Sequence, residues 1–166
     1  MRIYGRIALM ENKLAYQKAT VANIDELVTS RIKVLRTVFG ICETEDVKEI
    51  KEASAKYYKK AIEDGTHVAY LVYDKDVLVA VGGICYYQVM PMPYNPSGEK
   101  AYIMNMYTDE KYRGRGVAGK VVDLLVEDAK QKGIWKIALS ATEMGKPVYE
   151  KHGFIMDNDT MIYGKP

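Results

Sequence analysis

The chain has 166 residues, of which 48% are hydrophobic and 28% charged, and its formal net charge at pH 7 is +2. This size and balance fit one soluble domain with its own hydrophobic core and exclude a low-complexity chain. The small net charge argues against a nucleic acid or a membrane surface as partner, and no apolar run nears the roughly 20 residues of a membrane helix. Because nothing at the N-terminus resembles a signal peptide, a cytoplasmic location is expected.

Cys42 and Cys85 stand far apart without a CxxC pair, and the sequence has only two histidines. A structural zinc site needs four ligands at close spacing, so no metal is expected. In the cytoplasm, two isolated cysteines are expected to stay reduced.

The first elements expected along the chain are a short strand and a helix. Residues 1–12 form an N-terminal extension or an extra edge strand, and residues 13–166 form one domain. Residues 14–18 have the pattern of a strand. Apolar residues then recur at helical spacing until Gly40, which ends the helix. The face of this helix comprises Ile24, Leu27, Val28, Arg31, Leu35 and Val38.

A second helix is predicted for residues 46–64. Glu45 and Asp46 favour the positive N-terminal end of a helix, and Gly65 ends it. The stripe expected to face the core comprises Val47, Ile50, Ala53, Tyr57, Ala61 and Ile62.

After this helix the pattern becomes that of strands. Residues 67–73 and 77–88 are rich in β-branched and aromatic residues and are joined by a short polar turn, which predicts an antiparallel hairpin. Residues 90–98 hold three prolines and a glycine, so they predict a loop that forms a lip of a substrate site. Residues 100–108 are almost wholly apolar and predict a central strand.

The C-terminal part predicts a helix over residues 117–132, a strand over 134–141, a short helical segment over 147–151 and a hairpin over 154–163. The residues of the longer helix that are expected to face water are Lys120, Asp123, Glu127, Asp128 and Lys130. This order of elements predicts a single mixed α/β domain.

Two glycines alternate with two arginines just before the longer C-terminal helix. Gly114 and Gly116 carry no side chains that would keep an anion away from the backbone, and the first turn of a helix has N–H groups without partners. Arg113 and Arg115 add positive charge. The segment therefore predicts a phosphate-binding turn.

The glycines alone do not identify the phosphate compound. The P-loop pattern GxxxxGK[ST] is not met, because Val121 follows Gly119 and Lys120. The GxGxxG pattern of dinucleotide-binding proteins does fit residues 114–119, but here it stands late in the chain, behind a predicted antiparallel hairpin. A dinucleotide is therefore disfavoured as the ligand.

Two segments together resemble the GNAT superfamily of N-acetyltransferases. The residues Arg113-x-x-Gly116-x-Ala118 are similar to the family motif Q/R-x-x-G-x-G/A, and they follow a suitable strand. Residues 145–154, GKPVYEKHGF, resemble the LYxxxGF element of the family. Both segments stand in the family's order, with the expected helix and strand between them.

This resemblance, which extends over residues 14–163, implies a GNAT-like α/β (α+β) fold with a mostly antiparallel, splayed central sheet and helices on both faces. It implies acetyl-CoA as cosubstrate and no metal. The backbone of Met106, Tyr107 and Thr108 would bind the pantetheine arm. The pyrophosphate would be held, mainly by main-chain N–H groups, by Arg113, Gly114, Arg115, Gly116, Val117 and Ala118.

The resemblance also implies that Ser140 and Thr142 lie at the mouth of the splay. Many family members have an asparagine after this strand, where the present chain has Thr142 or Glu143. Tyr149 resembles the tyrosine that acts as general acid toward the leaving thiolate of CoA.

The base that removes the proton of the acceptor is not evident from the sequence. His67, Glu99 and Glu143 are candidates, and a chain of water molecules is an alternative. Cys85 lacks a histidine partner that would make it an acyl-accepting nucleophile, and it is expected to be a packed thiol.

The expected function is direct transfer of the acetyl group of acetyl-CoA to a primary amine of a small-molecule acceptor. The alternatives are a non-catalytic acyl-CoA-binding or sensor domain and a nucleotide-binding domain of another kind. Arg31 and Arg36, if they face the cleft, favour an acceptor with a carboxylate or phosphate group. Neither a nucleic acid nor a membrane is expected as partner, and a homodimer is compatible with the resemblance.

Overall fold

The computed structural model describes residues 14–157, which form one five-stranded sheet with the spatial order β1-β2-β3-β4-β5. Strands β1 to β4 are antiparallel to their neighbours, whereas β5 runs parallel to β4. The strands are β1 (Ala15–Lys18), β2 (His67–Asp74), β3 (Val77–Gln88), β4 (Glu99–Thr108) and β5 (Ile137–Leu139).

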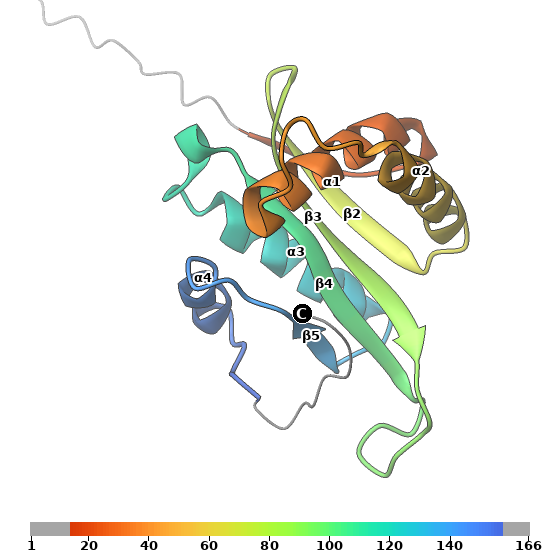
Figure 1. Cartoon of the computed structure of the whole chain (residues 1–166). Coiled ribbons are helices and arrows are strands. Elements are labelled where there is room, and N and C mark those ends of the chain that lie inside the picture. Colours follow the sequence, from red (N-terminus) through yellow and green to blue (C-terminus); the bar gives the residue numbers. More distant parts are fainter. Residues whose placement is uncertain (1–13, 158–166) are drawn as a thin grey trace, which may run out of the picture.

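Helices cover both faces of this sheet (Figure 1). Helices α1 and α2 lie on one face, and α3 lies on the other, with α4 packed beside α3. The helices are α1 (Ile24–Phe39), α2 (Lys48–Glu63), α3 (Val117–Gln131) and α4 (Lys146–Lys151), with short 3-10 helices at η1 (Val21–Asn23) and η2 (Glu110–Tyr112). The predicted mixed α/β fold with a mostly antiparallel sheet is confirmed.

The two faces of the sheet pack into two separate hydrophobic cores, as strand β2 shows. Leu71 packs with α1 and α2, and the next residue, Val72, packs with α3, because successive side chains of a strand point to opposite faces. Both side chains have no exposed surface. A strand buried on both faces must be apolar throughout, which accounts for the unbroken hydrophobic run in this part of the sequence.

The buried stripe of α2 differs from the predicted one. Tyr58, which the stripe omitted, is 4% exposed and packs under α1, whereas Tyr57 is 42% exposed at the edge of the helix. The periodicity of a helix with few apolar residues does not fix its rotation about its own axis to better than one residue. The prediction that Tyr57 is a core residue was wrong.

Asp128 of α3 was expected to face water, and this prediction was also wrong. Its side chain is 7% exposed, accepts a hydrogen bond from the Tyr86 hydroxyl at 2.8 Å, and pairs with the Lys18 ammonium of β1. The two partners lie on strands far away in the sequence, so the helical pattern carried no sign of them. A buried carboxylate is stable only when it is paired in this way.

The C-terminal strand is shorter than predicted, since only Ile137–Leu139 of the expected residues 134–141 pair with a neighbour. Residues 154–157, the start of the expected hairpin, are not in a strand. The remainder of that hairpin and the predicted N-terminal extension at residues 1–12 lie outside the described residues.

Candidate active site

The last five residues of β4 have no strand partner on the side of β5 within the described chain. Pairing with β5 involves Ala101, Tyr102 and Ile103 alone, while β4 continues to Thr108. We call residues 104–108 the open end of β4. Because β3 pairs with only one edge of this strand, the other edge presents backbone N–H and C=O groups that a ligand can reach.

A bulge lies within the open end of β4. The register with β3 shifts so that Gly82 faces two residues, Asn105 and Met106. Asn105 has a φ of 55°, in the left-handed region that asparagine tolerates better than most residues. A Cβ on Gly82 would lie 2.4 Å from the Met106 sulfur and 2.6 Å from Val121 of α3, so only glycine lets the bulge and the helix approach each other.

Residues 113–118, the glycine turn, connect η2 to α3 next to the open end of β4. Gly114 and Gly116 have φ values of 72° and 77°, a region that costs other residues roughly 1–2 kcal/mol. Gly116 is the N-cap of α3, and no side chain caps the helix there. A Cβ built on either glycine would have no atom within 4 Å. The turn thus has free N–H groups with open space before them, which fits a phosphate group.

The arginines of the glycine turn support it in different ways. Arg113 folds back, donates from Nε to the Thr108 carbonyl oxygen at 3.1 Å, and pairs with Glu110 at 3.6 Å. Arg115 lies 5.3 Å from the centre of the Tyr112 ring. Both guanidinium groups therefore add positive charge beside the turn.

Ser140 directly follows β5, Thr142 stands two residues further along the chain, and both are engaged in hydrogen bonds. The Ser140 Oγ lies 2.6 Å from the hydroxyl of Tyr102, across the point where β4 and β5 separate. The Thr142 Oγ1 accepts a hydrogen bond from the Gly145 N–H at 3.2 Å and so holds the turn that leads into α4. The Thr142 side chain thus has a structural task of its own.

Tyr149 lies on α4, close to these residues. Its ring packs edge-on against Phe154, with 6.0 Å between the ring centres. A Cβ on Gly145 would lie 3.1 Å from the ring, so the backbone of Gly145 packs against Tyr149. Burial, and to a lesser extent Tyr102, raises the pKa of the Tyr149 phenol above its usual value of 10.0. The phenol therefore stays protonated at neutral pH, which is the form that a proton donor requires.

His152 connects α4 to the first turn of α3. Its Nδ1 lies 2.6 Å from a carboxylate oxygen of Asp123, and a Cβ on Gly119 would lie 2.4 Å from its Nε2. The ring therefore rests on bare backbone beside the glycine turn. This contact fixes the position of Tyr149 relative to the N-terminal end of α3.

The three candidate bases do not meet at this site. His67 is 2% exposed, and burial lowers its pKa to about 4, so it is neutral and a weak base. Glu99 is exposed at the first residue of β4, at the far end of the strand from residues 104–108. Glu143 is exposed and pairs with Lys146. The structure assigns none of them to the acceptor.

Both cysteines are free thiols, and Cys85 is half-buried in β3. Burial raises the pKa of its thiol, which disfavours the thiolate that a nucleophile needs. Within residues 14–157, no group of His, Cys, Asp and Glu residues is arranged to hold a metal ion, and no helix is long and apolar enough to cross a membrane.

A hollow of about 630 Å³ lies along β5 between α3, α4 and the segment that follows α4. Tyr149, His152 and Phe154 line it, and it reaches Asp157, the last described residue. Neither the open end of β4 nor the glycine turn contributes to its lining. The hollow is therefore distinct from the gap between β4 and β5, and Tyr149 lies beside both.

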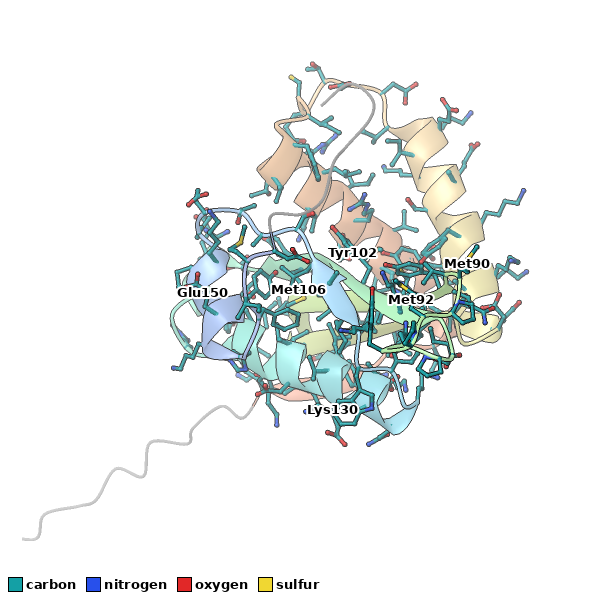
Figure 2. All side chains as sticks on the ribbon, turned by 90° about the horizontal axis from the view of Figure 1, so that it is seen from below. Met90, Met92, Tyr102, Met106, Lys130 and Glu150 are labelled. Atoms are coloured by element: carbon teal, nitrogen blue, oxygen red, sulfur yellow. The ribbon has the colours of Figure 1, made fainter. Side chains whose placement is uncertain are left out.

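Sequence reasoning missed three residues of this region. Tyr102 was seen only as part of an apolar strand, although Figure 2 shows its side chain beside β5. Asn105 interrupts that apolar strand, and this irregularity was the available signal of a bulge. His152 was seen only as part of the segment 145–154, but Gly119 inside a helix, where glycine is unfavourable, pointed to a close contact.

The comparison with family models gives the class of the protein. Residues 34–154 match the model described as the acetyltransferase (GNAT) family. The match covers more than two thirds of the chain and includes β4, the glycine turn and α4. The chain belongs to the GNAT family of acetyltransferases, whose cosubstrate is acetyl-CoA.

Solved structures agree with this assignment. A predicted acetyltransferase with acetyl-CoA from Clostridium acetobutylicum is 30% identical, with a TM-score of 0.83 over 92% of this chain and 96% of that one. A GCN5-related N-acetyltransferase from Ralstonia eutropha JMP134 has a TM-score of 0.77 over 93% and 98% of the two chains, but at 20% identity it supports the fold alone.

Curated relatives match a shorter part of the chain. The glucosamine 6-phosphate N-acetyltransferase of Trypanosoma brucei brucei is 36% identical over 53 residues, 32% of this chain and 36% of that protein. The enzyme of the same name from Arabidopsis thaliana is 32% identical over 68 residues, 41% and 44% of the two chains. The matched segments thus span less than half of these relatives, and the acceptor does not follow from them.

Proposed function

We propose that the protein transfers the acetyl group of acetyl-CoA directly to a primary amine of a small molecule. The observation that carries this proposal is the adjacency of the open end of β4 and the glycine turn. The turn offers free N–H groups for a pyrophosphate, and the strand offers an unpaired edge for the amides of a pantetheine arm. Tyr149 stands beside the point where the two strands separate.

In this mechanism the amine nitrogen attacks the thioester carbon, a C–N bond forms and the C–S bond breaks. A backbone N–H of residues 104–108 stabilises the negative charge on the carbonyl oxygen. The electron pair of the broken bond goes to sulfur, and the Tyr149 hydroxyl gives this thiolate a proton. The proton that the amine loses goes to water, since His67, Glu99 and Glu143 lie elsewhere or are otherwise engaged.

Labelled acetyl-CoA tests this proposal. In single turnover with a panel of primary amines, the label is expected on an amine as an acetamide, with one free CoA thiol for each acetamide and no label on the protein. Label on the protein before the amine is added would indicate an acyl-enzyme instead. Binding of CoA without transfer to any amine would support a binding or sensor domain.

The names of the curated relatives favour one acceptor class to include in that panel. Glucosamine 6-phosphate is a primary amine with a phosphate group, and both curated relatives are named for its acetylation. We include it as a candidate acceptor beside amino acids and amines without an anionic group.

A further inference from the structure

Helix α1 crosses the open end of β4 on the face opposite α3. The Lys33 ammonium lies 6.0 Å from the centre of the Tyr107 ring, and Asn105 donates a hydrogen bond to the hydroxyl of Tyr58 at 3.3 Å. Residues of α1, α2 and β4 thus meet above the bulge. An acceptor that approaches the thioester from this face would meet these side chains.

The three basic residues of α1 differ in their partners. Arg36 pairs with Glu43 and also donates to the Glu43 carbonyl oxygen. Lys33 lies over an aromatic ring. Arg31 is half-buried, and within residues 14–157 it makes no ion pair or side-chain hydrogen bond. Arg36 thus engages Glu43 through its terminal nitrogens, with its Nε buried and without an acceptor, whereas Arg31 has no protein partner of this kind in the described part of the chain.

Arg31 lies near the group that joins α2 to the bulge. Burial raises the pKa of the Tyr58 phenol to about 12, and the Arg31 charge opposes part of this rise. Arg31 also stands four residues from both Leu27 and Leu35 on α1, and these two residues pack with Tyr58 and Val47 at the α2 side. A guanidinium without a protein partner can bind a carboxylate or phosphate through two parallel hydrogen bonds.

Asn105 gives a second, independent indication of a ligand. The residue is 7% exposed, and its Oδ1 is buried without a donor. A buried carbonyl oxygen almost always accepts a hydrogen bond, from the protein, from water or from a bound group. An amine is a donor of the required kind, and Asn105 lies in the strand end where the thioester is expected under the proposed function.

We infer that the acceptor carries an oxyanion group, a carboxylate or a phosphate, that binds to Arg31, while its amine donates to the Asn105 side chain. This inference rests on the proposed function and adds the chemical class of its acceptor. Arg31 precedes residue 34, where the family match begins, so this contact belongs to the part of the chain outside the matched segment.

Calorimetry with protein saturated with CoA tests the inference without turnover. The probes are two matched pairs, glucosamine 6-phosphate with glucosamine and alanine with alaninamide. At least one anionic member is expected to bind roughly tenfold more tightly than its neutral partner. The pair that shows the difference identifies a phosphate or a carboxylate. Equal affinity within both pairs, or no binding of either anion, would overturn the inference.

The variant Arg31→Gln is expected to abolish the preference for the anionic probe and to leave the affinity for CoA unchanged. Lys59→Gln is the matched control, because it removes the same charge from an exposed site on α2. Where Arg31→Gln does not fold, Arg31→Lys keeps the charge without the planar fork and is expected to weaken the anionic probe selectively. An undiminished preference in the folded variant contradicts the role of Arg31.

The variant Asn105→Gly removes the side chain and suits the positive φ of this position. It is expected to weaken both members of a pair by roughly 2- to 10-fold, because both carry the amine, and to keep the preference for the anion. Unchanged affinity for both members of the pair would show that Asn105 does not contact the acceptor. If the wild-type protein does not bind CoA, the proposed function itself is contradicted.

Discussion

The imidazole of His152, just after α4, lies against the backbone of Gly119 in the first turn of α3, so closely that a Cβ on Gly119 would be 2.4 Å from its Nε2. Asp123, one turn further along α3, holds the other ring nitrogen at 2.6 Å. The helix that carries Tyr149 is thereby fixed beside the glycine turn. The proposed acetyl-CoA site and the proposed proton donor, Tyr149, are therefore linked through the contact between His152 and Gly119.

Replacing Gly119 by alanine is expected to displace His152 and lower the free energy of unfolding by about 1–3 kcal/mol, as overpacking does. Turnover should fall as well, because α4 moves with the ring. Thermal unfolding and steady-state rates measure both effects. The double variant Gly119→Ala, His152→Ala removes the clash and should recover part of the stability, and a purely additive loss would refute the contact.

Replacing Tyr149 by phenylalanine keeps the packing against Phe154 and removes the proton donor. The value of kcat is expected to fall by about 10²- to 10⁴-fold, with little change in the affinity for acetyl-CoA. Rapid kinetics and calorimetry separate the two quantities. A variant as fast as the wild type would show that the thiolate receives its proton elsewhere.

The ionisation of Tyr149 also predicts a pH dependence. Because burial raises its pKa above 10.0, the phenol stays protonated, and activity should not fall through this group anywhere below about pH 10. The profile of kcat against pH measures this for the wild-type protein. A loss of activity near pH 8 that is absent from the residual activity of Tyr149→Phe would contradict the raised pKa.

Replacing Gly116 by alanine tests the glycine turn, and Gly133→Ala is its matched control. Both glycines have a φ of 77° and open space at Cβ, one at each end of α3. Each variant should lose roughly 1–2 kcal/mol of stability. The affinity for acetyl-CoA should fall only in Gly116→Ala, by roughly tenfold or more, since the new methyl group stands where the phosphate approaches. Equal affinities for acetyl-CoA in the two variants would show that the phosphate does not bind at this turn.

His67 is expected to lower the stability of the folded protein as the pH falls. Its pKa is about 4 in the folded protein and 6.5 unfolded, so the unfolded chain binds a proton first as the pH falls. Stability from this group is complete above about pH 6.5 and declines toward pH 4, by roughly 3 kcal/mol in all. Urea unfolding of wild type and His67→Gln across this range measures the difference. The same decline in both proteins would show that His67 is not its source.

Much of the fold follows from local patterns in the sequence. The hairpin of β2 and β3, the helix after the glycine turn and the loop near Met90 and Met92, which Figure 2 shows between β3 and β4, were predicted in the correct order and type. These elements have strong periodicity or clear breakers such as proline and glycine. Each of these elements is determined by residues within a few positions of one another, which is why the sequence alone predicts it.

The errors arose where distant residues decide the outcome. Asp128 is buried because Lys18 and Tyr86 reach it from other strands, and Tyr58 replaces Tyr57 in the core because α1 and the sheet lie on that side. The bulge at Asn105 depends on its pairing with β3. Tertiary contacts of this kind leave no periodic mark in the sequence.

Titration of the protein with acetyl-CoA in a calorimeter, with ATP and NAD in parallel, tests the central claim most directly. We expect saturable binding of one acetyl-CoA per chain, a similar affinity for CoA, and no binding of ATP or NAD at the same concentrations. Binding of ATP or NAD without binding of CoA would contradict the assignment of residues 113–118 and the open end of β4 to the acetyl donor.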